Sequence, residues 1–141
     1  MPRPAKAPAP DVYEETTLGV LVRVTPEFLP DQSDPGQAQF TWAYTVEVEN
    51  HRAEPVQLVS RHWVITDARG HVEEVKGPGV VGVQPTLGPR EAFRYRSGCP
   101  LTTSSGGMQG SYQMVTPAGE AFEAVIPAFS LHLPQATQRP N

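Results

Sequence analysis

Apolar and polar residues alternate along several short stretches of this 141-residue chain. Alternation with a period of two indicates β-strands that bury one face. In the clearest stretch, five apolar residues share a face and are separated mainly by threonine and glutamate: Phe40, Trp42, Tyr44, Val46 and Val48. A slip of one residue would expose all of them, so the register of this strand is strongly specified.

Further strands are predicted on both sides of this one. Residues 18–24 alternate strictly, and Pro26 is expected to end that strand. The segments 111–116 and 121–133 form a later pair. The second of these changes phase at Pro127, as at a β-bulge.

A β-hairpin that leads into a glycine loop is predicted at residues 57–82. Its turn lies at residues 67–70 (Asp-Ala-Arg-Gly), and its apolar face is formed by Val59, Trp63 and Ile65. Perfect alternation would place Arg61 on the inward face, where an unpaired charge is costly. Either a bulge turns Arg61 outward or a carboxylate meets it, and we expect it at the sheet rim with an ion-pair or hydrogen-bond partner.

The fold class predicted from these patterns is all-β. No stretch of ten residues shows an apolar stripe with the period of a helix. About seven antiparallel strands indicate an immunoglobulin or fibronectin type III-like sandwich. One domain is expected at residues 13–133, between a disordered Pro/Ala-rich arm (1–12) and a disordered tail (134–141). Residues 97–110 are rich in glycine, serine and threonine and are expected to form a long loop that carries function.

Charge and composition limit the partners. The formal charge of −4 and pI of about 5.5 argue against nucleic acid as the main partner, because phosphate binding needs a clustered basic surface. No apolar run approaches the roughly 20 residues that cross a bilayer, so no membrane role is expected. A single cysteine and an N-terminus without an apolar export segment predict a cytoplasmic protein. An edge strand near Pro127 would allow a homodimer.

A series of motifs in order closely resembles the ApaG family: Ser60-Arg-His-Trp63, Ile65-Thr-Asp67, Val72-Glu-Glu-Val75, Gly79-Val-Val-Gly82, Gln84-Pro85, Ser97-Gly-Cys-Pro-Leu101 and Gly110-Ser-Tyr-Gln-Met114. The resemblance covers roughly residues 13–133. It implies a fibronectin type III-like sandwich in a small bacterial cytosolic protein associated with cobalt and magnesium tolerance. It also implies a relationship to domains that are thought to bind partners in some eukaryotic F-box proteins and in a polymerase-associated protein. Pro78 departs from the acidic residue that many members carry there.

The segment Gly77–Gly82 satisfies the pattern G-x-G-x-x-G. In a dinucleotide-binding unit this pattern opens a helix, but Val80, Val81 and Val83 favour a strand. We therefore interpret the glycines as a corner that needs positive φ or a close backbone approach. The alternative is a nest of backbone amides that takes a phosphate or carboxylate with help from Arg61 or Lys76.

Other reactive side chains lack the spacing that chemistry requires. The four histidines are not in ligand spacing and Cys99 has no second thiol beside it, so no metal site and no cofactor is predicted. Asp67, Glu73 and Glu74 would attract hard cations only weakly. Cys99 shows no adjacent base, and Ser104 and Ser105 lie outside a nucleophile motif. No catalytic residue is assigned, and the protein is predicted not to be an enzyme.

The function predicted from the sequence is a non-enzymatic binding module with a protein or small anionic partner. The alternative is a sensor or enzyme that binds nucleotides or pyrophosphate through the Gly77–Gly82 loop. The candidate contact residues are Arg61, His62, Lys76, Gly77, Gly79, Gly82, Ser97 and Gly98.

Overall fold

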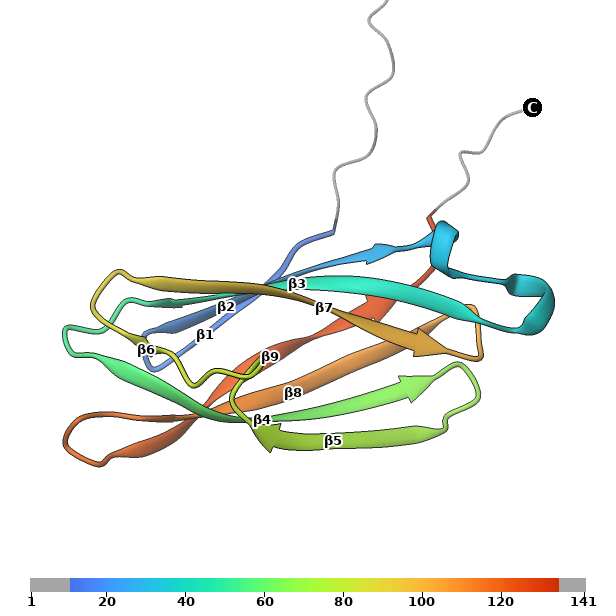
Figure 1. Ribbon diagram of the computed structural model, residues 1–141. Coiled ribbons are helices and arrows are strands. Elements are labelled where there is room, and N and C mark those ends of the chain that lie inside the picture. The colour runs from blue at the N-terminus through green and yellow to red at the C-terminus, as the bar shows by residue number, and fades with distance from the viewer. Residues whose placement is uncertain (1–10, 135–141) are drawn as a thin grey trace, which may run out of the picture.

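The computed structural model describes residues 11–134 and shows a β-sandwich of two antiparallel sheets packed face to face (Figure 1). This confirms the predicted all-β fold class. This described part contains nine strands where about seven were predicted, because two short strands carry little alternation. Nearly all of the predicted arm and tail lies outside the described residues.

One sheet has the strand order β1-β2-β3-β7 and the other β5-β4-β8-β9, with β6 paired to β4. The first sheet consists of β1 (Tyr13–Thr17), β2 (Val20–Phe28), β3 (Phe40–Asn50) and β7 (Ala92–Leu101). The second consists of β4 (Val56–Asp67), β5 (Val72–Pro78), β6 (Thr86–Leu87), β8 (Gly106–Val115) and β9 (Ala121–Leu131). Two 3-10 turns, η1 (Pro30–Gln32) and η2 (Pro35–Gln37), join β2 to β3. Among the described residues, no helix has the length and apolar character needed to cross a membrane.

The strands bury the faces that alternation predicts. Trp42, Val46 and Val48 of β3 are buried, and Val20, Val22 and Val24 of β2 join them in one core. Leu18, assigned to that strand from sequence, instead lies exposed in the turn before it, with φ 47°.

Pro26 does not end β2, contrary to prediction. It pairs with Tyr44 of β3, and the strand continues to Phe28. The neighbouring strand β1 pairs with β2 only as far as Val24. Beyond Val24 that side of β2 is an edge, and a proline without an N–H is tolerated there.

The predicted long loop at residues 97–110 is also wrong. Strand β7 continues to Leu101 and β8 begins at Gly106, so only residues 102–105 connect them. Gly110 serves strand packing, since a Cβ atom there would lie 2.0 Å from the carbonyl O of His62. The phase change at Pro127 is confirmed, because the β8–β9 register shifts between Met108 and Gly110, opposite Pro127.

The sandwich is closed along one side and open along the other. On the closed side β9 packs against β1 and β2; the ring of Tyr13 lies 5.9 Å from that of Phe129, and Val125 N donates to Thr17 Oγ1 (3.1 Å). An ion pair of 3.3 Å between Asp11 and His132 joins the two ends of the described chain. On the open side, β5 and β7 are the free edges of their sheets.

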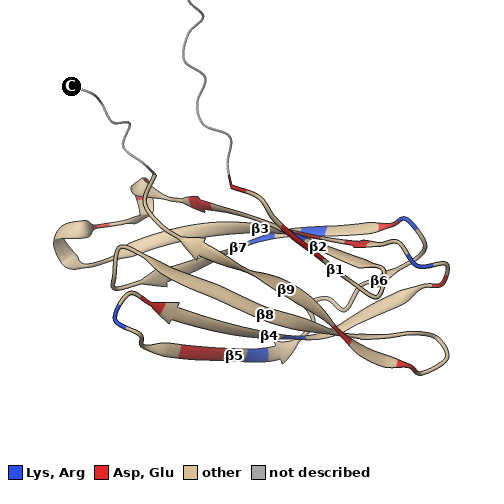
Figure 2. Cartoon of the chain, turned by 180° about the vertical axis from the view of Figure 1, so that it is seen from behind, with Lys and Arg blue, Asp and Glu red and all other residues tan. Residues whose placement is uncertain are grey.

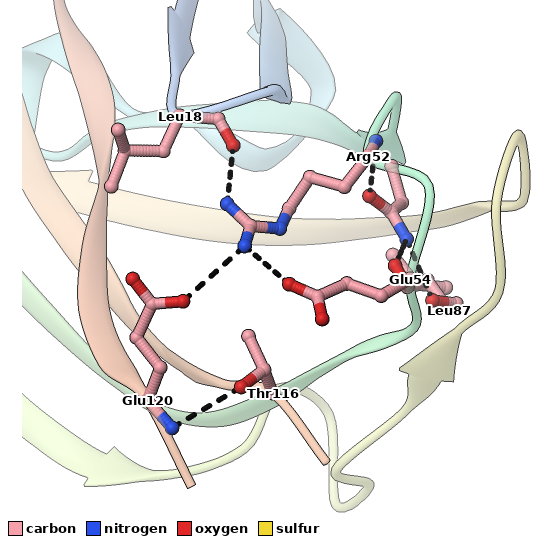
Figure 3. A network of polar contacts seen from close by, with 7 residues as sticks. Leu18, Arg52, Glu54, Leu87, Thr116 and Glu120 are labelled. Atoms are coloured by element: carbon pink, nitrogen blue, oxygen red, sulfur yellow. Dashed lines mark hydrogen bonds and ion pairs between the residues drawn. The ribbon is translucent and has the colours of Figure 1, made fainter. Parts of the chain in front are cut away.

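Arg52 ties three connections together at one end of the sandwich (Figure 3). Its Nη1 donates to the carbonyl O of Leu18 (2.9 Å), and its Nη2 lies 2.5 Å from Glu54 and 3.3 Å from Glu120. The guanidinium also lies 5.0 Å from the centroid of the Phe122 ring. These contacts join the β1–β2, β3–β4 and β8–β9 connections.

Candidate functional site

The predicted glycine loop is a backbone corner after β5. Gly79 has φ +58°, and a Cβ atom there would lie 2.1 Å from the carbonyl O of Val83. Val81 and Gly82 both have positive φ (41° and 85°) and form a two-residue turn closed by hydrogen bonds between Val80 and Val83. Positive φ at both central residues is typical of a type I′ turn. Within residues 11–134 no helix follows Gly82, so the glycines form the predicted corner and not the turn of a dinucleotide-binding unit.

The amides of this corner are largely used within the chain. Gly79 N donates to Val59 O, Val80 N to Val83 O, and Val83 N to Val80 O, at 2.8 to 2.9 Å. An anion nest requires several converging amides without internal partners. The arrangement therefore gives little support to phosphate binding by this loop.

A β-bulge in β4 anchors the corner. Leu58 pairs with Met114 and Ser60 with Gln113, which leaves Val59 as the additional residue. The carbonyl O of Val59 accepts hydrogen bonds from Gly79 N and Gln84 Nε2, both 2.8 Å. In a regular strand pair this carbonyl would bond within the ladder. The bulge leaves it free to accept hydrogen bonds from the corner.

Arg61 lies on the inward phase of β4, opposite Gly77 of β5. We predicted that a bulge would turn Arg61 outward or that a carboxylate would meet it, but the bulge at Val59 leaves Arg61 on the inward phase. Its Nη1 donates to the carbonyl O atoms of Pro78 and Gly79, both 2.9 Å, so the predicted hydrogen-bond partner is backbone. A Cβ atom on Gly77 would lie 3.0 Å from Arg61 Nη2, so glycine at position 77 makes room for the guanidinium.

His62 and Lys76 face each other on the outer surface of the β4–β5 pair. They border a hollow of about 300 Å³, the His62 hollow, lined by Ser60, Arg61, His62, Lys76, Gly77, Gln113 and Glu123. His62 Nε2 lies 2.8 Å from Glu74 Oε1. Four of the predicted contact residues, Arg61, His62, Lys76 and Gly77, therefore line one surface feature.

Polar side chains continue the floor of the His62 hollow across β8. Ser60 Oγ donates to Gln113 Oε1 (2.7 Å), and Gln113 Nε2 donates to Ser111 Oγ (3.0 Å). The row offers a partner fixed hydrogen-bonding groups on a rigid sheet.

Ser97 and Gly98 do not join this surface. They lie on β7 in the other sheet, where Ser97 pairs with Tyr44 and Gly98 with Ala43. A Cβ atom on Gly98 would be 3.6 Å from Trp42 O, an ordinary contact, so the backbone there has no special need for glycine.

Three tyrosines and the cysteine lie between the sheets. Tyr95 and Tyr112 share a hydrogen bond between their hydroxyl groups. Burial raises the pKa of both hydroxyls and that of Tyr44. Burial also raises the pKa of the Cys99 thiol to about 11, so it stays protonated at neutral pH. A protonated, buried thiol is a poor nucleophile.

The histidines are dispersed. His51 lies 3.3 Å from Glu49, His62 is paired with Glu74, and His132 with Asp11. Among residues 11–134, no three His, Cys, Asp or Glu side chains converge as a metal site would require.

Sequence reasoning missed a pocket of about 450 Å³ on the open side of the sandwich, walled by Phe40, Ile65 and Leu101 and bordered by Glu73. The register of the hairpin is the signal that would have found it. Glu73 pairs with Ile65, so it belongs to the inward phase of β5. Figure 2 shows acidic residues and a lysine close together along β5.

Comparison with known proteins gives a consistent result. Residues 30–116 match the family model described as the ApaG domain. The chain is similar to Protein ApaG of Rhodospirillum centenum, with 58% identity over 130 residues that cover 92% of this chain and 100% of the relative. It is also 56% identical to Protein ApaG of Caulobacter vibrioides, covering 92% of each chain.

Solved structures agree with these sequence matches. The crystal structure of an ApaA protein from Bordetella pertussis has a TM-score of 0.81 and 46% identity, covering 91% of this chain and 99% of that one. The C-terminal domain of wzt has a TM-score of 0.52 and 11% identity, covering 91% and 81% of the two chains, and shares the fold alone.

Proposed function

Since this chain belongs to the ApaG family, we propose that it is a non-enzymatic binding module that contacts a protein partner or a small anionic ligand. The contact surface is the His62 hollow together with the adjoining corner at Gly79 and Gly82. The partner covers the outer face of β4, β5 and β8.

One observation carries this proposal: the ammonium group of Lys76 lies beside the hydrogen-bonded side chains of Ser60, Gln113 and Ser111 on a rigid sheet. Lys76 has no ion-pair partner within residues 11–134, whereas His62 is held by Glu74. Ser60 and Gln113 are already hydrogen-bonded to each other. A carboxylate or phosphate of a partner would meet Lys76 without a large rearrangement of its surroundings.

The non-enzymatic assignment is supported by the state of the reactive groups. The Cys99 thiol is buried and its pKa is raised to about 11. The hydroxyls of Tyr95 and Tyr112 are bonded to each other inside the core. Neither the Cys99 thiol nor the two tyrosine hydroxyls border the His62 hollow.

We propose that this binding takes place in the cytoplasm and contributes to cobalt and magnesium tolerance, as the family resemblance implies. The protein would act through its partner, because no group of metal ligands converges within residues 11–134. Cation tolerance is then lost when the partner contact is lost.

Affinity capture from an extract of the source organism tests the proposal. Lys76→Glu should release the partner, while Arg94→Glu, an exposed arginine on the other sheet, should retain it. A substitution at Gly79 would disturb the corner itself, so it could not separate loss of contact from loss of structure. If every captured protein survives both Lys76→Glu and His62→Ala, the contact surface lies elsewhere.

The small-anion branch is tested with inorganic pyrophosphate. Amide resonances of Lys76, Gly77, Gly79 and Gly82 are followed while pyrophosphate is added to millimolar concentration. Shifts at Lys76 that vanish in Lys76→Glu support an anion at the His62 hollow. Absence of shifts at all four amides removes both this branch and the nucleotide alternative.

A further inference from the structure

The pocket on the open side of the sandwich lies at a different place from the His62 hollow and has a different chemistry. We call it the Glu73 pocket. Its volume of about 450 Å³ falls in the usual range for ligand sites. Both sheets form it, through Phe40 of β3 and Leu101 of β7 on one side and Ile65 of β4 and Glu73 of β5 on the other.

Part of the wall of the Glu73 pocket is apolar and already ordered, beside polar residues such as Gln39, Thr41 and Thr102. Phe40, Ile65 and Leu101 are half-buried and pack against the core. The side chain of Leu101 lies over Gly106, where a Cβ atom would come within 2.7 Å of Leu101 Cδ1. When a partner covers apolar surface that is already ordered in this way, the removal of that surface from water favours binding.

A carboxylate without a counterion borders these walls. Glu73 stands opposite Ile65 in the β4–β5 register, on the phase that faces the other sheet. Within residues 11–134 it has no hydrogen-bond or ion-pair partner. Its neighbour Glu74 points to the outer face and is bonded to His62.

The rest of the rim adds negative charge. Asp67 borders the pocket, and backbone N–H groups of His71 and Arg69 donate to its Oδ1, which lowers the pKa of that carboxyl. The segment between β2 and β3 contributes Gln32, Ala38 and Gln39 to the lining, and it contains Asp31 and Asp34 but no lysine or arginine. His71, which also lines the pocket, and Arg69 in the β4–β5 turn are the basic residues beside Asp67.

An aliphatic chain that ends in a cation complements both features. Its methylene groups would cover Phe40, Ile65 and Leu101, and its charge would meet Glu73 at the mouth. We propose that the Glu73 pocket receives a lysine or arginine side chain, flanked by an apolar residue, from an extended segment of a partner protein.

Inward-pointing charges on edge strands also discourage pairing with other chains. That role would need no ligand, so the test must separate it from recognition. Strand β5 already carries Lys76 and Pro78, which protect an edge by themselves.

The test uses the full chain with labelled isoleucine and leucine methyl groups and three blocked peptides. The probe is acetyl-Ala-Leu-Lys-Leu-Ala-amide, and two matched peptides replace its lysine with norleucine or with glutamate. The lysine peptide should shift the methyl signals of Ile65 and Leu101 and bind about fivefold more tightly than the norleucine peptide, as expected for a partly exposed ion pair. Raising the salt concentration should reduce this preference.

Two neighbouring glutamates supply the matched variants. Glu73→Gln should abolish the preference for lysine, and Glu74→Gln should leave it unchanged. The proposal is overturned if lysine and norleucine peptides bind equally, or if the Ile65 and Leu101 signals do not move. It is equally overturned if Glu73→Gln only increases self-association while peptide binding stays the same, because Glu73 then protects the edge. Partner capture by Lys76→Glu tests only the His62 hollow, so the proposals for the two sites can be refuted independently.

Discussion

Gly79 and Gly82 both have positive φ, but only Gly79 lies against another part of the backbone. An added Cβ atom at Gly79 would overlap the carbonyl O of Val83, whereas one at Gly82 would meet nothing within 4 Å. We expect Gly79→Ala to lower the free energy of unfolding by about 3 kcal/mol or more, and Gly82→Ala by only about 1 kcal/mol, the cost of positive φ alone. Urea denaturation measures both.

Gly82→Asn is the control for backbone conformation, since asparagine tolerates positive φ. It should be less destabilising than Gly82→Ala. Equal losses of unfolding free energy for Gly79→Ala and Gly82→Ala would show that the corner relaxes around the new side chain at position 79.

The buried thiol of Cys99 makes stability depend on alkaline pH. Burial raises its pKa from 9.0 to about 11, so between these values the folded state binds more protons than the unfolded state. The stabilising contribution is complete below pH 9 and is lost as pH rises toward 11. We expect a loss of about 1 kcal/mol between pH 9 and 10, measured by urea unfolding at each pH.

Cys99→Ser is the reference for this effect, because a hydroxyl does not ionise in that range. The difference in stability between wild type and variant should narrow between pH 9 and 10. A constant difference would contradict a raised thiol pKa. The buried tyrosines have raised pKa values as well, so they contribute mainly at higher pH.

At the scale of elements, the bulge in β4 controls the position of the glycine corner. Removing Val59 would leave Leu58 inward and Ser60 outward, so the phase of Trp63 would be preserved. The variant should fold, but it loses the carbonyl that binds Gly79 N and Gln84 Nε2. We expect faster hydrogen exchange at the Gly79 amide and a loss of about 1–3 kcal/mol in stability.

Val59→Ala keeps the bulge and its carbonyl and serves as the comparison. Its Gly79 amide should exchange as slowly as in the wild type. Unchanged exchange after deletion of Val59 would mean that another carbonyl takes over the role.

Elements with a long, regular alternation could be predicted from sequence, and short or crowded ones could not. Trp42 and its neighbours mark β3 because tertiary packing and local pattern agree there. Strand β1 is not predicted because its residues alternate little, and residues 97–110 are predicted as a loop because glycine usually signals one. In this fold Gly106 and Gly110 are strand residues, required by the close approach of neighbouring backbone and side-chain atoms.

The candidate site was predictable to a similar extent. Arg61, His62, Lys76 and Gly77 come together because they lie on one hairpin, whose register local sequence specifies. Ser97 lies in the other sheet, and sequence carries no signal for the distance between two sheets. The same limit hid the Glu73 pocket, which needs residues from both.

At the scale of the whole molecule, Arg52 links the two sheets. Its guanidinium joins Leu18 in the first sheet's β1–β2 turn to Glu120 in the second sheet's β8–β9 turn. Its side chain is only 18% exposed, so these bonds are partly shielded from water. Arg52→Met should lower the unfolding free energy by about 2 kcal/mol, measured by thermal and urea unfolding.

Arg96→Met tests whether any lost ion pair has this effect. Arg96 pairs with Glu27 at 3.2 Å, but both side chains are more than half exposed. The loss of unfolding free energy in Arg96→Met should therefore be close to zero. Similar losses for Arg52→Met and Arg96→Met would argue against a special role for the linkage between sheets.

The ion pair between Asp11 and His132 brings the ends of the described chain together on the closed side. A fluorophore or a sensor-chip tether attached at position 11 or at position 132 would therefore occupy the same flank. Immobilised in this way, the protein would present its free β5 and β7 edges to the flowing sample.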